Sequence, residues 1–210
     1  MNIPTDYRPA GVGDFIGGTR AVAAIALAKA RRLNLAGAGN YRLLLHGAPG
    51  VGKSTLAGLV ALTLTGHPLA IERLNGQSVT VDKVRDWRDR AGYRPLWGAR
   101  RCIIVEECDA MGQAALNEWR TFSDTLPPGT DYILTTNRAL ADLQPQFQSR
   151  AQQYACPPVT GEEVADFLAK RFELPPEVAA TIASGCAGDV RAALCDAESW
   201  LDCAGTEVGQ

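Results

Sequence analysis

The sequence has very little of the chemistry on which zinc proteins and disulfide-rich proteins depend. Only two histidines occur among its 210 residues, and its six cysteines stand singly, with no Cys-x-x-Cys pair. Zinc sites need clusters of these residue types, so we expect no zinc site. We interpret the cysteines as reduced, mostly buried thiols of a cytoplasmic protein. They are Cys102, Cys108, Cys156, Cys186, Cys195 and Cys203.

Long apolar runs and a charge imbalance are also lacking. No stretch approaches the roughly 20 apolar residues that span a bilayer, so we expect no membrane partner. Residues 1–9 contain no apolar signal core, which again favours a cytoplasmic protein. Because the formal net charge is only -2, any contact with nucleic acid must depend on a local basic patch.

Short apolar runs alternate with helical patterns over the first three quarters of the chain. Strands are expected at residues 41–46, 69–74, 102–106, 132–136 and 152–155, and helices at 20–32, 55–64, 81–91 and 113–123. Strands that alternate with helices predict an α/β fold whose parallel sheet is covered on both faces.

The pattern changes at Pro157-Pro158, after which everything is typical of helices. Thr160 and Glu163 form a Thr-x-x-Glu capping box. Helices are expected at residues 161–172, 176–184 and 189–202. We therefore expect an α/β domain over residues 1–157 and a small all-helical lid domain over residues 158–210.

The segment Gly47–Ser54 matches the pattern G-x-x-x-x-G-K-[ST] and lies between an expected strand and an expected helix. Its glycines let backbone N–H groups face phosphate oxygens, and the helix N-terminus adds partial positive charge. Lys53 would contact the β and γ phosphates and Ser54 a magnesium ion. A chance glycine-rich turn is the alternative, and the strand–loop–helix context disfavours it. The expected nucleotide-binding residues are Gly47, Pro49, Gly50, Val51, Gly52, Lys53, Ser54 and Thr55.

Two carboxylates follow the apolar run that ends at Val105. Ligands of α/β sheets bind at the carboxyl ends of strands. We expect Glu106 to hold the magnesium ion through water and Glu107 to polarise the attacking water. A strand that ends in solvated acids is the alternative, and the P-loop makes it the weaker one.

The expected strand over residues 132–136 ends at Asn137. An amide at this position can hold the lytic water between the γ phosphate and Glu107. Taken alone, Asn137 is interpreted equally well as a turn-forming residue.

Together with further short motifs, these residues resemble the AAA+ clamp-loader ATPases, especially the small subunits of replication factor C. The resemblance runs from Tyr7 to about Leu194, and the order and spacing of the motifs carry it. Arg120 falls on the first Arg of the family's L-R-R helix. The other matching motifs are Tyr7-Arg8-Pro9, Phe15-Ile16-Gly17, Leu74-Asn75, Val81-Asp82-Lys83-Val84-Arg85, Glu107-Cys108-Asp109-Ala110-Met111, Ser149-Arg150 and Gly188-Asp189-Val190-Arg191.

The resemblance implies an ATPase that uses ATP and Mg²⁺ in an oligomer of AAA+ subunits. Tyr7, Arg8 and Pro9 would help to house the adenine. Arg150 would reach the ATP of a neighbouring subunit, and Arg191 would contact the γ phosphate within its own subunit. Ordinary surface arginines are the alternative for both. The expected catalytic residues are thus Lys53, Glu107, Asn137, Arg150 and Arg191.

The sequence departs from the family pattern in three places. Glu106 stands where the family has Asp, which adds a methylene to the expected magnesium shell, and Ala151 replaces the Cys of Ser-Arg-Cys. Because the chain stops near residue 210, we expect the family's collar domain to be missing, so the resemblance extends to the ATPase core alone.

The expected partners are other AAA+ subunits and primer-template DNA, with a sliding clamp as a further candidate.

Basic residues crowd the segment 83–101, where acidic residues are interleaved with them. In the resembled family this helix lines the ring and follows the DNA backbone, so Lys83, Arg85 and Arg88 would contact phosphates. The alternative is a solvated helix with pairs of opposite charge at i,i+3 and i,i+4. Two other functions stay open: a DNA-bound regulatory ATPase, as in helicase loading or transposition, and an ATP-gated assembly module with little turnover.

Overall fold

The computed structural model describes residues 7–207, with side chains for residues 7–203. The chain divides into two compact units, neither of them a single continuous segment. The α/β unit consists of Ala24–Gly47 and Lys53–Ala155. The helical unit consists of the described parts of Met1–Ala23, Ala48–Gly52 and Cys156–Gln210. The boundary at residue 157 between two independent domains stays a prediction.

The α/β unit contains a five-stranded parallel sheet with the order β2-β3-β4-β1-β5. The predicted parallel α/β fold is confirmed. Central strands are buried on both faces, which is why β1 and β3 are nearly continuous apolar runs in the sequence. The strands are β1 (Arg42–His46), β2 (Ile71–Asn75), β3 (Arg101–Glu106), β4 (Thr130–Thr136) and β5 (Gln152–Ala155).

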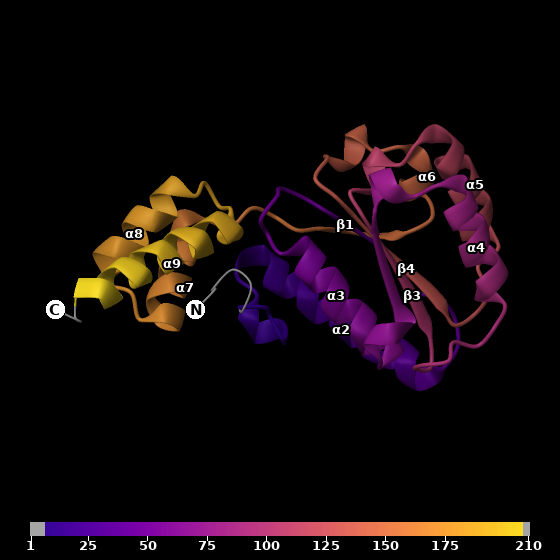
Figure 1. Ribbon diagram of the computed structural model, residues 1–210, viewed down its shortest axis with the longest axis horizontal. Helices are drawn as coiled ribbons and strands as arrows, with labels where there is room; N and C mark the ends of the chain where they lie inside the picture. The colour runs from indigo at the N-terminus through magenta and orange to yellow at the C-terminus, as the bar shows by residue number, and fades with distance from the viewer. Residues whose placement is uncertain (1–6, 208–210) are drawn as a thin grey trace. The chain divides into compact units, whose positions relative to one another are not determined.

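Helices cover both faces of this sheet (Figure 1). On one face α2 (Gly17–Ala36) lies beside α3 (Lys53–Thr65), where the Asn34 amide donates to the Thr63 carbonyl at 2.8 Å. On the other face lie α4 (Val81–Ala91) and α5 (Gln113–Asp124), and a short helix, α6 (Pro145–Gln148), precedes β5. Within residues 7–207, none of the helices combines the length and the apolar composition that crossing a bilayer requires.

Aromatic side chains fill the layer between the sheet and the helices α4 and α5. Trp119 lies edge-on to Trp87 and to Tyr132, with ring centroids 5.9 and 5.1 Å apart. Phe122 contacts both tryptophans. All four side chains are almost fully buried, so this layer supplies a large share of the unit's apolar core.

The helical unit is built from α7 (Gly161–Phe172), α8 (Pro176–Gly185) and α9 (Val190–Glu207). The predicted capping box at the start of α7 is confirmed: the Glu163 N–H donates to Thr160 Oγ1 at 3.3 Å, and the Thr160 N–H donates to Glu163 Oε2 at 2.9 Å. The apolar core of this unit includes Val164, Leu168, Leu174, Ala179, Ala183, Ala193 and Ala197.

Short 3-10 turns punctuate the connections, and one of them corrects an expected strand. The strand predicted from residue 69 begins only at Ile71, because Pro68–Ala70 forms a 3-10 turn. His67 Nδ1 accepts the Leu69 N–H at 3.2 Å and caps that turn. The other 3-10 turns are Val12–Asp14, Gly76–Ser78, Cys108–Ala110 and Leu140–Asp142.

A buried ion pair ties together the amino-terminal ends of the strands. Arg100 and Asp131 are 1% and 0% exposed. Arg100 donates from Nε to Asp131 Oδ2 at 2.8 Å and from Nη2 to Oδ1 at 2.6 Å. Asp131 Oδ1 also accepts the Tyr41 N–H at 2.6 Å, so one carboxylate joins the starts of β1, β3 and β4.

Candidate nucleotide-binding and active site

The sheet order brings the predicted nucleotide motifs to one edge. β4 lies between β1 and β3. His46 pairs with Thr136, and Val105 pairs with Leu134, all strands running in the same direction. The P-loop after β1, Asn137 after β4 and the two glutamates at the end of β3 therefore leave the sheet on the same side.

The P-loop has the backbone and the charge that a phosphate group needs. Gly47, Gly50 and Gly52 have φ values of 147°, 75° and 91°, which only glycine adopts readily. Lys53 begins α3, is 7% exposed, and donates from Nζ to the Gly47 carbonyl at 2.9 Å. Burial, together with the charge of Lys53, lowers the pKa of His46. A buried ammonium at a helix N-terminus inside a glycine loop fits a bound polyphosphate.

Oxygen donors suited to magnesium stand beside this loop. Ser54 follows Lys53 at the start of α3, and the half-buried Glu106 ends β3. Hydroxyl and carboxylate oxygens are the ligands that Mg²⁺ prefers, so both predicted metal ligands fit the ion. Arg73 links them, since its Nη2 donates to the Ser54 carbonyl at 3.3 Å and its Nη1 lies 3.9 Å from Glu106 Oε1.

Asp189 lies against the P-loop within the helical unit. A Cβ added to Gly50 would come within 1.9 Å of Asp189 Oδ1. The same oxygen accepts the N–H groups of Arg191 and Ala192, at 2.9 and 3.1 Å, and so caps α9. The predicted Gly-Asp-Val-Arg motif thus contacts the P-loop through its aspartate, and the side chain of Arg191 is exposed.

Glu107 has an unusual backbone conformation at the end of β3. Its φ and ψ are 49° and 52°, in the left-handed region that non-glycine residues rarely adopt. Its carbonyl accepts the Ala110 N–H at 2.9 Å and lies so close to Gly76 that a Cβ there would come within 2.2 Å of it. Such outliers gather at functional sites, and this one points to a carboxylate held in a set position.

Sequence reasoning assigned no role to Asn75, although it contacts the expected general base. The Asn75 amide donates from Nδ2 to Glu107 Oε2 at 3.0 Å, and its Oδ1 accepts the Gln77 N–H at 3.0 Å. Asn75 ends β2 and pairs with Glu106 in register, at the same edge of the sheet. The sequence feature that could have pointed to Asn75 is its position as a polar residue at the end of a predicted strand.

The predicted adenine-binding segment packs on the helical unit. The ring of Tyr7 lies 5.4 Å from that of Phe167 and 5.8 Å from that of Phe172, and the Arg171 guanidinium lies 5.3 Å above it. The Tyr7 hydroxyl donates to the Asp14 carbonyl at 3.1 Å. Three side chains of α7 thus surround this ring. Contact of Tyr7, Arg8 and Pro9 with adenine stays a prediction.

Arg150 lies on the surface of the α/β unit in a bidentate ion pair. It donates from Nε to Asp124 Oδ1 at 2.7 Å and from Nη2 to Oδ2 at 3.0 Å. Its carbonyl accepts the Tyr132 hydroxyl at 2.7 Å, which fixes the backbone to the core. Beside the pair is a surface hollow of about 490 Å³, lined by Asn117, Arg120, Thr121, Asp124 and Thr125.

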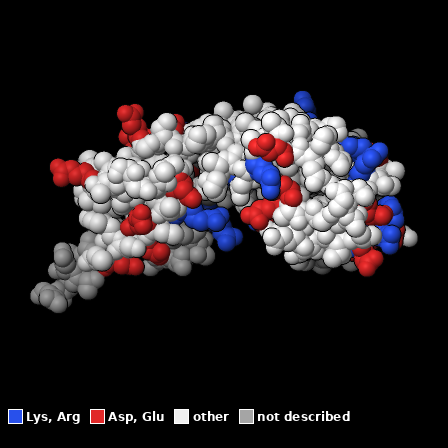
Figure 2. Space-filling model, turned by 90° about the horizontal axis from the view of Figure 1, so that it is seen from above, with Lys and Arg blue, Asp and Glu red and all other residues white. Residues whose placement is uncertain are grey.

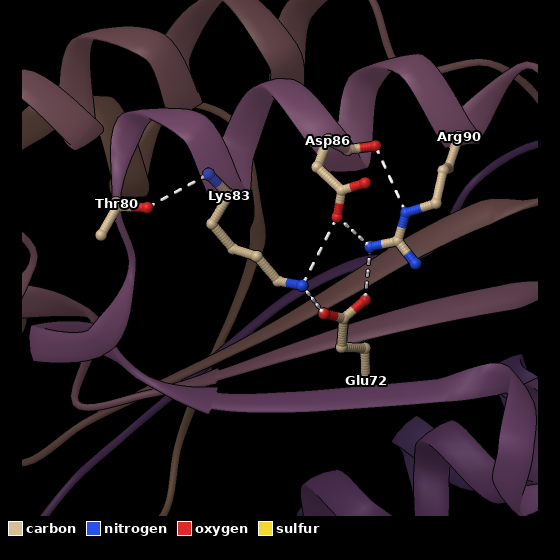
Figure 3. Close-up of polar contacts among 5 residues, drawn as sticks. All are labelled: Glu72, Thr80, Lys83, Asp86 and Arg90. Carbon is tan, nitrogen blue, oxygen red and sulfur yellow. Dashed lines mark hydrogen bonds and ion pairs between the residues drawn. The ribbon is translucent and has the colours of Figure 1, made fainter.

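The three predicted DNA contacts are all ion-paired within the protein. Lys83 pairs with Glu72 and Asp86, and Arg90 pairs with the same two carboxylates (Figure 3). Figure 2 shows basic and acidic side chains interleaved, without a continuous basic stripe, at the right-hand end of the face it displays.

The other two predicted contacts share one acid. Glu118 of α5 lies 3.6 Å from Arg85 Nε and 2.6 Å from Arg88 Nη1. Pairs at i,i+3 and i,i+4, as the solvated-helix alternative has them, join Lys83 to Asp86, Asp82 to Arg85 and Asp86 to Arg90. The pair of Arg88 goes to another helix, and DNA contact by Lys83, Arg85 and Arg88 stays a prediction.

A comparison with protein families shows to which family the chain belongs. The profile described as "ATPase family associated with various cellular activities (AAA)" matches residues 43–158, more than half of the chain. The chain belongs to this family. Membership makes it an ATP-hydrolysing enzyme that uses ATP with Mg²⁺, as the P-loop predicted. No curated protein matches the sequence.

Solved structures with the same fold include proteins of Thermotoga maritima. A point variant of RuvB has a TM-score of 0.72 at 20% identity, and the RuvB Holliday junction branch migration motor has a TM-score of 0.70 at 20%. Both matches cover 91% of this chain and 64% of RuvB, so the chain spans less than two thirds of RuvB. A DNA polymerase III gamma subunit-related protein has a TM-score of 0.62 at 19% identity, over 82% of this chain and 57% of that one. These likenesses establish the AAA+ fold.

Proposed function

We propose that this AAA+ ATPase works on DNA within an oligomer, as a clamp-loader-like protein of DNA replication in the cytoplasm. The observation that carries the proposal is the common edge at which the P-loop, Asn137 and Glu107 follow three adjacent strands. DNA as the partner is supported by what the similar folds are described as: a Holliday junction branch migration motor and a polymerase III gamma-related protein.

Hydrolysis follows from the chemistry of the side chains at this edge. ATP bound with Mg²⁺ supplies the γ-phosphoryl group that passes to water. Lys53 would neutralise negative charge on the phosphates, while the Ser54 hydroxyl and, through a water, the Glu106 carboxylate would hold the metal. Glu107 orients and polarises the attacking water, and the Asn137 amide fixes that water from the neighbouring strand. The rate enhancement comes from positioning and charge neutralisation.

Arg150 acts on the nucleotide of a neighbouring subunit. Its position on the surface of the α/β unit, beside a hollow lined by Arg120 and Asp124, supports this role. In the free chain its guanidinium is occupied by Asp124, so on assembly it exchanges a carboxylate for a phosphate. Arg191 is exposed and lies two residues after Asp189, the residue that packs against Gly50, and it acts on the γ phosphate of its own subunit.

Large apolar side chains that are exposed at residue 69 and within residues 93–97 support a protein partner. Leu69, Tyr93, Leu96 and Trp97 are 69%, 75%, 96% and 53% exposed, and the His67 ring stacks on Trp97 at 5.2 Å. Exposed apolar side chains that gather on a surface mark protein–protein contact sites. We propose a sliding clamp as the partner for this surface.

The second candidate is a DNA-bound regulatory ATPase, as in helicase loading or transposition. The ion pairs of Lys83, Arg85 and Arg88 weaken the clamp-loader-like candidate, in which α4 follows the DNA backbone, because a helix whose cations are already neutralised is poorly suited to that task. A regulatory ATPase that contacts DNA elsewhere does not need these cations. An assembly module with little turnover is the third candidate, with Glu106 as its only support.

ATP turnover measured with and without primer-template DNA and a sliding clamp tests the proposal. In parallel, the mass of the complex is determined in a slowly hydrolysed ATP analogue. We expect an oligomer, turnover stimulated by primed DNA, and further stimulation by the clamp. Stimulation by DNA without any response to the clamp would favour the regulatory candidate. A monomer whose turnover responds to neither would overturn the proposal.

A further inference from the structure

One carboxylate holds both chain neighbours of Asn137. Thr136 Oγ1 donates to Asp109 Oδ1 at 2.6 Å, and Arg138 Nε donates to Asp109 Oδ2 at 2.8 Å. The Arg138 N–H in turn donates to Thr136 Oγ1 at 3.1 Å. Residues 136 and 138 are therefore tied to the same side chain and to each other, with Asn137 between them.

The restraint acts where the chain leaves the sheet. All seven residues of β4 are buried, ending at Thr136, which is 1% exposed, whereas residues 137–139 are exposed. No strand pairing continues beyond Thr136, so side-chain contacts set the direction of residue 137. Charge-assisted hydrogen bonds such as the one between Arg138 and Asp109 are shorter and stronger than neutral ones.

Asp109 also belongs to the turn that carries Glu107. The 3-10 turn Cys108–Ala110 follows Glu107 directly, and the Ala110 N–H donates to the Glu107 carbonyl at 2.9 Å. Burial raises the pKa of Asp109, but the hydrogen bonds from Thr136 and Arg138 outweigh it and lower the pKa overall. The group is ionised at neutral pH and keeps both bonds.

We propose that Asp109 is a positioning residue for ATP hydrolysis: it links the Glu107 turn to the start of the Asn137 loop, so that both side chains hold the same water. This inference rests on the proposed roles of Asn137 and Glu107. In this role Asp109 acts through Asn137, because it holds the residues on either side of it. Glu107 is thus held from two sides, by Asn75 on its carboxylate and by the Asp109 turn on its backbone.

A double-mutant cycle in the full-length protein tests this inference. We compare Asp109→Ala, Asn137→Ala and the double variant, measuring kcat and the affinity for a slowly hydrolysed ATP analogue with Mg²⁺. Misplacing a catalytic group by about 1 Å costs roughly 100-fold in rate, so Asp109→Ala should lower kcat roughly 10- to 100-fold. Its affinity for the analogue should stay within about twofold. In the Asn137→Ala background, Asp109→Ala should cost little more, because the group it positions is gone.

Two milder variants keep the test decisive if Asp109→Ala does not fold. Thr136→Val removes the hydrogen bond from Thr136 to Asp109, and with it the one from the Arg138 N–H to Thr136, at almost constant shape. Arg138→Met removes the bond from Arg138 to Asp109 and keeps the apolar stem. Each should lower kcat by less than the full loss and leave analogue binding unchanged. Asp166→Ala, which removes an exposed carboxylate paired with Lys170, is the matched control and should change neither quantity.

The outcomes separate this inference from the proposed function. If Asn137→Ala does not lower kcat, the assignment of Asn137 fails and the inference with it. If Asn137→Ala lowers kcat but the Asp109 and Asn137 effects multiply, or the Asp109, Thr136 and Arg138 variants keep full kcat, Asp109 does not act through Asn137. In that case the proposed function stands and the positioning role is overturned.

Discussion

The carboxylate of Asp189 occupies the space that a side chain at residue 50 would fill. Asp189 Oδ1 lies 1.9 Å from the position of a Cβ on Gly50, whose φ is 75°. Because that oxygen also caps α9, the P-loop and the first turn of α9 share one carboxylate. Residue 50 therefore has to be glycine for two reasons: its φ is positive, and the carboxylate of Asp189 leaves no room for a Cβ.

Gly50→Ala should weaken ATP binding roughly tenfold or more. A left-handed backbone costs a non-glycine residue about 1–3 kcal/mol, and the clash with Asp189 adds to this. Titration with ATP and Mg²⁺ measures the effect. Gly185→Ala is the control, since a Cβ at Gly185 meets nothing within 4 Å and its φ is not positive. Equal ATP affinity of the Gly50→Ala and wild-type proteins would show that the P-loop does not bind nucleotide in this conformation.

Asp131→Ala should destabilise the α/β unit by about 3–5 kcal/mol, because it leaves the buried Arg100 guanidinium without its counter-charge. Thermal and denaturant unfolding check this. Asp166→Ala breaks an exposed pair and should cost less than about 1 kcal/mol. If both variants lose the same small amount, the Arg100–Asp131 pair does not hold the strand ends together.

Glu118→Gln tests whether α4 contacts DNA, because the substitution should increase affinity for DNA. It removes the acid that Arg85 and Arg88 share, which leaves Arg85 with only its exposed pair to Asp82, so affinity for DNA should rise, and the salt dependence should steepen. Arg88→Glu should lower affinity similarly for all sequences. Binding to labelled primer-template DNA at several salt concentrations measures both effects.

Controls for the DNA measurement match the charge change elsewhere on the chain. Asp166→Asn and Lys170→Glu alter net charge as Glu118→Gln and Arg88→Glu do, on an exposed pair of α7. If all four variants shift affinity according to net charge alone, α4 is a solvated helix with paired charges and not a DNA contact.

The elements and site residues that depend on interactions between near neighbours in the sequence could be predicted, and those that depend on distant contacts could not. α4 begins at Val81 as predicted, because Thr80 Oγ1 accepts the Lys83 N–H three residues later. The P-loop could be predicted for the same reason, because its residues follow one another in the sequence. Asp109 and Arg138 were not assigned roles, because their contact depends on β3 and β4 being neighbours, and sequence periodicity does not give strand order.

Arg150→Ala should bind ATP like the wild type and turn it over poorly, because an arginine supplied in trans stabilises charge in the transition state. Such arginines are generally worth roughly 10³- to 10⁵-fold in rate. Wild-type activity per molecule should rise with protein concentration. Arg31→Ala, on the exposed surface of α2, is the control for loss of a surface arginine.

Mixing two inactive variants tests the same role directly. Arg150→Ala combined with Lys53→Ala should recover part of the activity, because each supplies what the other lacks at a shared interface. If the mixture stays inactive and wild-type activity per molecule is independent of concentration, Arg150 does not act on a neighbour's nucleotide.

The most direct measurement is ATP binding and ATP turnover in the same preparations of wild type, Lys53→Ala and Glu107→Gln. We predict that Lys53→Ala loses nucleotide-dependent activity, because the buried ammonium of the P-loop is gone. Glu107→Gln should bind ATP like the wild type, and its turnover should fall by a factor of roughly 100 or more. The substitution keeps the shape of the side chain and removes the charge that polarises water. Unchanged turnover in Lys53→Ala, or full turnover in Glu107→Gln, would contradict the account.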